Sequence, residues 1–146
     1  MEFNSKVSVV IKWYRVESWL YERGFVFFAK IIYHLIQVLF GCTIPYSAVL
    51  EKGVNVAHFH GIVIHQKSHI KSGTIIYQNV CLGGRNGKGG PNVGHNCIIG
   101  AGACILGEIT IGDNVKIGAN AVVLEDIPSN CTVVGVPAVV VKKGGD

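Results

Sequence analysis

Aliphatic residues recur at every sixth position through the second half of the chain. Two further positions of each hexad are constrained, because the residue after the aliphatic one is glycine or leucine and the fifth residue is apolar and mostly small. The aliphatic positions are Val93, Ile99, Ile105, Ile111, Ile117 and Val123. A short strand that buries one aliphatic side chain, followed by a tight turn, explains this period. Three such strands close a triangular coil of about 18 residues.

The repeat continues less regularly toward the N-terminus. The step of six holds at Ile44, Leu50, Val56 and Ile62, and a two-residue slip then leads to Ile70, Ile76 and Leu82. Residues 83–92 (GGRNGKGGPN) interrupt the repeat and predict a loop that leaves the repeating body and returns. Stacked coils pair as parallel strands around one aliphatic core, so the sequence predicts an all-β parallel β-helix of roughly five coils. A β-sandwich is excluded, because its strands alternate with period two.

Two helices are predicted before the repeats, at residues 5–22 and 25–40, with Gly24 and Gly41 as their stops. We therefore expect an N-terminal helical segment at residues 1–41 and a β-helix domain at residues 42–146.

The segment 25–40 is strongly apolar but carries Lys30, His34 and Gln37 on one helical stripe. A membrane-spanning helix needs about 20 apolar residues, so this shorter segment is not expected to span. It is expected either to pack in the protein or its oligomer, or to lie on a membrane surface. The polar residues scattered through the first 23 positions exclude a secretory signal.

Composition narrows the class of protein further. Thirteen basic and nine acidic residues give 13 − 9 = +4, too mild an excess for an obligate nucleic-acid binder. The five cysteines form no C-x-x-C pair, so we expect reduced thiols in a cytoplasmic protein. The glycine-rich loop is not a P-loop, because no serine or threonine follows Lys88. One H-x-x-x-H spacing occurs, at His65 and His69, but these residues flank the slip and no third ligand accompanies them in a metal-binding motif, so no metal is predicted.

Specific segments of the repeat region resemble a known family. They are GVNVAHFHGIVIHQKSHIKSGTIIYQNVCLGG at residues 53–84, IGAGACILGEITIGDNVKIGANAVVLEDIP at residues 99–128, and the later VVGVPA. Over residues 42–140 the chain resembles the serine acetyltransferase branch of the hexapeptide-repeat acyltransferases. The resemblance implies a left-handed β-helix, a homotrimer, and transfer of an acetyl group from acetyl-CoA to a hydroxyl. The implied enzyme is cytoplasmic, and membrane-associated if residues 25–40 contact lipid.

His58 matches the position of the family's general base. It is the third residue of its hexad, an outward position that His95, Ala101 and Ala119 share in later hexads. A neutral imidazole, with an ordinary pKa near 6.5, can take a proton from a hydroxyl at neutral pH. The resemblance therefore assigns catalysis to His58.

Three departures from the family pattern concern the acceptor. The family's aspartate that orients the histidine is replaced by Thr43, and the aspartate before the histidine by Ala57. The loop is shorter than the family's and lacks its Asp-Arg-His. The acceptor hydroxyl is thus either that of L-serine or that of a sugar in a polysaccharide precursor. The other classes left open are a non-catalytic β-helix scaffold and a carbonic anhydrase on the same fold.

The resemblance also implies where coenzyme A binds. The family holds the pantetheine arm between subunits against small residues, and the matching positions are Gly84, Ala101, Gly102 and Ala119. Lysine ammonium groups would meet the phosphates, and the available ones are Lys116, Lys142 and Lys143.

The remaining histidines are expected to have other roles. His60 falls in the inward fifth column and is predicted to be structural. His65 and His69 flank the slip and are predicted to be solvated or at an interface. His95 follows the loop and is a candidate for lining the site.

Overall fold

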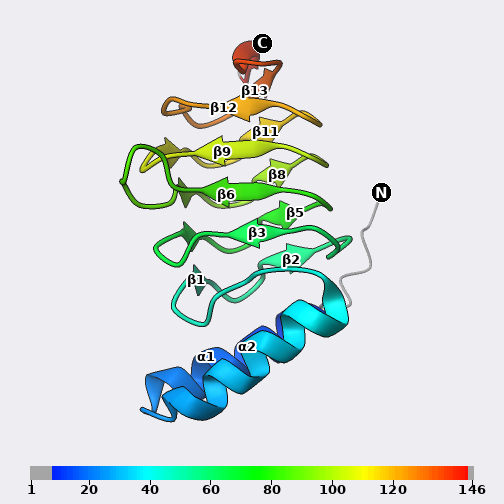
Figure 1. The fold of residues 1–146 in the computed structure, drawn as a ribbon. Coiled ribbons are helices and arrows are strands. Elements are labelled where there is room, and N and C mark those ends of the chain that lie inside the picture. Colours follow the sequence, from blue (N-terminus) through cyan, green and yellow to red (C-terminus); the bar gives the residue numbers. More distant parts are fainter. Residues whose placement is uncertain (1–7, 145–146) are drawn as a thin grey trace.

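The computed structural model describes residues 8–144, which form a stack of β-coils on a pair of helices (Figure 1). Helix α1 spans Val9–Glu22 and helix α2 spans Val26–Phe40, so both predicted helices are confirmed in this part of the chain. Residues 5–7 of the first prediction lie outside the described residues. Gly41 ends α2 in the left-handed conformation, with φ of 61°, as the stop signal predicts.

Short strands line the three faces of the stack. Face 1 contains β1 (Val49–Leu50), β4 (His69–Ile70), β7 (Asn92–Val93) and β10 (Thr110–Ile111). Face 2 contains β2 (Asn55–Val56), β5 (Ile75–Ile76), β8 (Ile98–Ile99), β11 (Lys116–Ile117), β13 (Cys131–Val134) and β14 (Val139–Lys143). Face 3 contains β3 (Val63–Ile64), β6 (Cys81–Gly83), β9 (Cys104–Leu106) and β12 (Val122–Val123).

Strand pairing confirms a parallel β-helix. On face 3 each strand pairs in parallel with its counterpart one coil away, through Thr43, Val63, Cys81, Cys104 and Val122. These four steps correspond to four turns of the chain, and β13 adds one more strand to face 2. The sequence prediction of roughly five coils is therefore slightly high. Strand β14 turns back and pairs antiparallel with β13 at the C-terminal end.

The aliphatic column of the hexads forms the core, but the slip lies earlier than the sequence suggests. Ile64 aligns with Leu82 on face 3, and Ile62 occupies the small-residue column beside Val80. Both isoleucines are buried, at 0% and 1% exposure. The two residues that make this coil longer than the others therefore lie in the turn before Ile62. The sequence predicts the slip after Ile62, and this prediction is wrong.

The loop predicted at residues 83–92 is confirmed between β6 and β7, where the green segment projects from the stack (Figure 1). Its edges are slightly tighter than predicted, because Gly83 ends β6 and Asn92 begins β7.

Helix α1 is tied to the first coil by its buried face. The Tyr14 hydroxyl donates to the Ala48 carbonyl at 2.6 Å and accepts from the Leu50 amide at 3.2 Å. The Arg15 guanidinium donates to the carbonyls of Leu50 and, at 2.6 Å, of Glu51. In residues 8–144, neither helix has the length and apolarity needed to cross a membrane.

All five cysteines are free thiols, as predicted. Cys42, Cys97 and Cys131 are buried, and Cys81 and Cys104 are half-buried on face 3. Burial raises the pKa of Cys42 to about 11, so this thiol stays protonated and behaves as a small apolar residue.

Candidate active site

His58 projects from an enlarged turn between faces 2 and 3. The Ala57 amide bonds to the Ile76 carbonyl, nineteen residues ahead, whereas the Val63 amide bonds to the Val80 carbonyl, only seventeen ahead. The turn over residues 58–60 contains the additional residues, and both of its histidines are exposed. His60 was predicted to face the core, and this prediction is wrong because the insertion moves it out of the inward column.

Contacts from the end of α2 fix this turn. The ring of Phe59 packs edge-on against Phe40, with centroids 5.4 Å apart. The Gly61 amide donates to the Gly41 carbonyl at 2.9 Å, and the Asn79 amide donates to the His60 carbonyl at 2.9 Å. These contacts anchor the turn just after His58, and the bond of the Ala57 amide to the Ile76 carbonyl holds the chain just before it.

In the described part of the chain, His58 has no carboxylate partner. Among residues 8–144 its imidazole makes no hydrogen bond, and the single ion pair there joins His69 to Glu51 at 2.9 Å. Tyr77 of the next coil is its aromatic neighbour, with ring centroids 6.3 Å apart. Sequence reasoning missed Tyr77, although it stands where later hexads have glycine or leucine.

On the coils that follow the His58 turn, further side chains lie along the same corner of the stack. The Gly102 amide bonds to the Gln78 carbonyl at 2.9 Å, and the Asn120 amide bonds to the Ala101 carbonyl at 2.8 Å. These contacts align Gln78, Ala101 and Ala119 on successive coils of the corner that carries the His58 turn. Ala119 is exposed and Ala101 is half-buried, so the upper part of the corner is lined by methyl groups.

Each of the two predicted cofactor-binding glycines already has a structural reason to be glycine. Gly102 has φ of +72°, and a Cβ there would lie 2.2 Å from Oδ1 of Asn120. A Cβ on Gly84 would lie 2.8 Å from the Lys88 carbonyl oxygen, within the loop itself. Close backbone approach within the chain therefore accounts for both positions, and their contact with coenzyme A stays a prediction.

The predicted basic residues gather near the C-terminal end of face 2. Lys116 pairs with Thr132, which pairs with Lys142, so the two lysines come from neighbouring strands. They line a cleft of about 240 Å³ together with Asn114 and Asn130. Lys143, the next residue of β14, is exposed.

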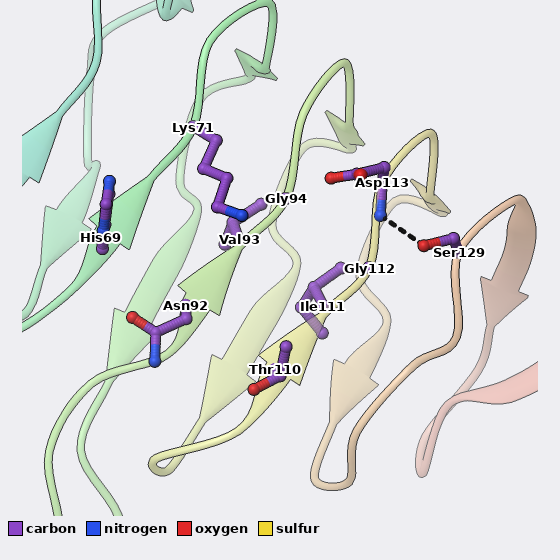
Figure 2. A pocket seen from close by; sticks show the side chains of 10 residues that line it. All are labelled: His69, Lys71, Asn92, Val93, Gly94, Thr110, Ile111, Gly112, Asp113 and Ser129. Atoms are coloured by element: carbon purple, nitrogen blue, oxygen red, sulfur yellow. Dashed lines mark hydrogen bonds between the residues drawn. The ribbon is translucent and has the colours of Figure 1, made fainter.

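Another cleft lies along face 1 (Figure 2). Its volume is about 400 Å³, and its polar lining includes His69, Lys71 and Asp113. His95 belongs to this corner, because its Nδ1 pairs with Ser72 Oγ at 2.9 Å and its amide donates to Asp113 at 2.7 Å. His95 therefore does not join His58 within one chain, although it follows the loop in sequence.

Neither His65 nor His69 adjoins His58. His65 is half-buried beneath the loop, near Gly84 and Gly90. His69, on β4, is held by Glu51. Within residues 8–144 no group of three or more histidine, cysteine, aspartate or glutamate side chains is arranged to hold a metal ion.

Comparison with known proteins identifies the class first. The model for the bacterial transferase hexapeptide (six repeats) matches residues 90–125. A solved serine acetyltransferase in complex with CoA superposes with a TM-score of 0.85 and 38% identity, covering 90% of this chain and 55% of that one. A serine acetyltransferase from Brucella abortus, also solved with coenzyme A, superposes with a TM-score of 0.89 and 34% identity, covering 92% of this chain and 55% of that one. The fold is thus the left-handed β-helix of hexapeptide-repeat transferases, as the resemblance implied.

Sequence relatives narrow the class to a family. The chain is 42% identical over 135 residues to the serine acetyltransferase of Synechococcus elongatus, covering 90% of this chain and 55% of that protein. It is 39% identical over 133 residues to the Helicobacter pylori serine acetyltransferase, covering 89% of this chain and 78% of that protein. The chain belongs to the serine acetyltransferase family. It spans only about half the length of several relatives, including the cyanobacterial one.

Proposed function

We propose that the protein is an acetyl-CoA-dependent O-acetyltransferase that uses His58 as its general base. L-serine is the first candidate acceptor, because the relatives are named serine acetyltransferases. The observation that carries the proposal is the exposed imidazole of His58, which has no hydrogen-bond partner among residues 8–144, at the corner lined by Ala101 and Ala119. A thioester arm lying against these small side chains would place its carbonyl carbon near the imidazole.

The proposed reaction needs no covalent enzyme intermediate. Neutral His58 takes the proton of the acceptor hydroxyl while that oxygen attacks the thioester carbonyl carbon. The tetrahedral intermediate collapses, the C–S bond breaks, and the imidazolium returns the proton to the coenzyme A thiolate. Ala101, Gly102, Ala119 and Gly84 would contact the pantetheine arm.

The basic cleft offers a place for the phosphates of the cofactor. Lys116 and Lys142 come from neighbouring strands and supply mobile positive charge, and exposed Lys143 adds a third ammonium group.

The test compares the two histidines of one turn. His58→Ala should lower kcat by about 10²–10⁴-fold, the usual contribution of general-base catalysis, with coenzyme A release as the readout. His60→Ala is the matched control, because it removes another exposed imidazole two residues away. Coenzyme A binding should survive in both variants. Full activity of His58→Ala with a confirmed acceptor would defeat the proposal.

A sugar hydroxyl is the second candidate acceptor. Thr43 and Ala57 stand where the family pattern has aspartates, so two carboxylates that would suit the ammonium group of serine are missing. Parallel assays with L-serine and with neutral glycosides would decide, since a protein acting on serine should show the higher kcat/KM for it. The same assays exclude the scaffold class if any acceptor is turned over.

We further propose a closed homotrimer. The outward residues of face 3 are short, namely Val63, Cys81, Cys104 and Val122, and allow a neighbouring subunit to approach closely. Such an assembly would close the cofactor groove between subunits. Light scattering at micromolar concentration tests this, and a monomer would contradict the shared site. The free thiols agree with a cytoplasmic location.

The helical pair is the surface that we propose for contact with an anionic membrane. It exposes large apolar side chains that include Trp13, Trp19, Phe25, Phe27 and Phe28. Exposed Lys12, Arg23 and Lys30 outnumber the single exposed acid of the two helices, Glu22. Aromatic and basic residues on helices too short to span are typical of interfacial binding.

Vesicle sedimentation tests the membrane contact. The Phe27→Ser/Phe28→Ser variant should lose binding to anionic vesicles, whereas Val136→Ser, which removes an exposed apolar side chain at the other end of the coil stack, should retain it. If wild type ignores anionic vesicles and these substitutions instead reduce its mass in light scattering, the surface packs against a second copy.

A further inference from the structure

The chain that leaves helix α2 runs directly beside the turn of His58. Thr43 begins face 3, where its amide donates to the Ile62 carbonyl at 2.7 Å and its carbonyl accepts from the Ile64 amide at 2.8 Å. Because Thr43 occupies the position aligned with outward-facing Val63, its hydroxyl faces the outside of the stack, as His58 does. Thr43 also stands where the family pattern has the aspartate that orients the histidine.

A glutamine of α2 holds the Thr43 hydroxyl in place. Gln37 Nε2 donates to Thr43 Oγ1 at 3.4 Å and to the Tyr33 hydroxyl at 3.1 Å. Gln37 Oε1 pairs with His34 Nδ1 at 3.1 Å, and an amide oxygen only accepts, so Nδ1 of His34 carries the hydrogen. Both hydrogens of Nε2 are therefore committed, and the orientation of the amide is fixed.

This arrangement leaves the Thr43 oxygen ready to accept a second hydrogen bond. A hydroxyl oxygen has two acceptor sites, and Gln37 occupies one of them. Among residues 8–144 the His58 ring has no hydrogen-bond partner, and it is exposed, so it is free to turn. In the described part of the chain, the unpaired imidazole and the oxygen with a free acceptor site thus lie on neighbouring segments, which pair through Gly41 and Gly61.

We propose that Gln37 and Thr43 together position His58, with Thr43 Oγ1 accepting the Nδ1–H of the imidazole. This inference rests on the proposed role of His58 as the base. The contact selects the tautomer in which Nε2 is unprotonated and can take the acceptor's proton. The proposed contact also explains why the largely apolar helix α2 carries the polar residues His34 and Gln37.

The proposed pair of Thr43 and His58 carries no negative charge, and this affects how activity depends on pH. A carboxylate beside His58 would favour the imidazolium and raise its pKa, whereas a threonine oxygen adds no charge. Activity with the native pair should therefore persist to lower pH than activity with an aspartate at position 43.

The first test removes the glutamine and restores a carboxylate. Gln37→Leu should lower kcat about tenfold, with an unchanged coenzyme A dissociation constant. Adding Thr43→Asp should restore kcat, because a carboxylate accepts from His58 without help, and should move the acid limb of the pH profile upward. Gln37→Glu should retain activity, since Thr43 then donates to position 37 and still accepts from His58. Val38→Ala, an exposed change next to Gln37 on α2, should keep the kcat of wild type.

The second test asks whether the two residues act as a unit. Gln37→Leu and Thr43→Val should give the same loss of kcat, and the double variant should be no worse than either one. Additive losses, failure of Thr43→Asp to rescue Gln37→Leu, or a lowered Tm with unchanged kcat would each overturn the proposal. Failure of the underlying function is distinguishable, because then His58→Ala itself retains activity.

Discussion

Phe40, the last residue of helix α2, packs edge-on against Phe59, the residue that follows His58, with an interplanar angle of 82°. Both rings are partly buried against the core. The contact joins the helical pair to the enlarged turn at a distance of one residue from the proposed base. The position of His58 therefore depends on how α2 is seated on the first coil.

Removing the Phe40 ring should affect catalysis as well as stability. Phe40→Ala deletes an aromatic partner of Phe59 and should destabilise the fold by about 2–3 kcal/mol, because the ring is only partly buried. It should also lower kcat about tenfold by loosening the turn. Urea unfolding and steady-state kinetics measure the two effects separately. Phe40→Leu should recover most of the stability and part of the rate, and an unchanged kcat in Phe40→Ala would show that the turn holds its own position.

A bulky side chain on the His58 corner should block the cofactor. Ala119 is exposed at the proposed groove, so Ala119→Leu should weaken coenzyme A binding by at least tenfold with little change in Tm. Equilibrium titration with coenzyme A measures this. Lys52→Leu places the same side chain at an exposed position on another corner and should bind normally. Equal affinity of all three proteins would remove Ala119 from the groove.

Two glycines separate backbone strain from steric overlap. Gly102 and Gly87 have nearly equal φ, +72° and +73°, but only Gly102 lies under another side chain. Gly87→Ala should cost about 1 kcal/mol for the left-handed conformation alone. Gly102→Ala should cost more, because its Cβ would overlap Oδ1 of Asn120. Chemical denaturation compares the two, and equal losses would mean that the asparagine moves aside freely.

The hexad pattern predicted the β-helix, because burial of one aliphatic residue per strand is a local property of the sequence. The slip was misplaced because Ile62 and Ile64 are both isoleucine and both fit an inward column. Backbone pairing decides between them, and pairing is set between coils about 18 residues apart. The error for His60 follows from the same cause.

The neighbours of His58 depended on relations that sequence spacing does not contain. Gln37 stood out as a polar residue on an apolar helix, but its contact with Thr43 requires the angle at which α2 meets the first coil. His95 follows the loop in sequence, yet the chain has passed face 1 before reaching it, which places it on another corner. Tyr77 became a neighbour of His58 only through the stacking of coils.

Glu17 makes the stability of the helical pair depend on pH. Its side chain is fully buried on α1, and neither carboxylate oxygen has a partner among residues 8–144. Burial raises its pKa from an ordinary 4.5 to about 8, and the titratable groups that feel its charge include Tyr14, Tyr33 and Cys42. The carboxyl is therefore neutral in the folded protein at neutral pH.

The folded-state pKa lies above the unfolded one, so the unfolded chain loses the proton first as pH rises. The free energy of unfolding should be highest below about pH 4.5 and should fall between pH 4.5 and 8, by roughly 5 kcal/mol at most. Above pH 8 it should stay constant, because the carboxyl is then ionised in both states. Glu17→Gln carries no titrating proton and should lose this slope, becoming the more stable protein at pH 8 to 9. Urea unfolding midpoints at pH 5, 7 and 9 measure it. Glu22→Gln, an exposed change on the same helix, should retain the wild-type slope. Parallel slopes for wild type and Glu17→Gln would mean that the carboxyl is already ionised in the fold.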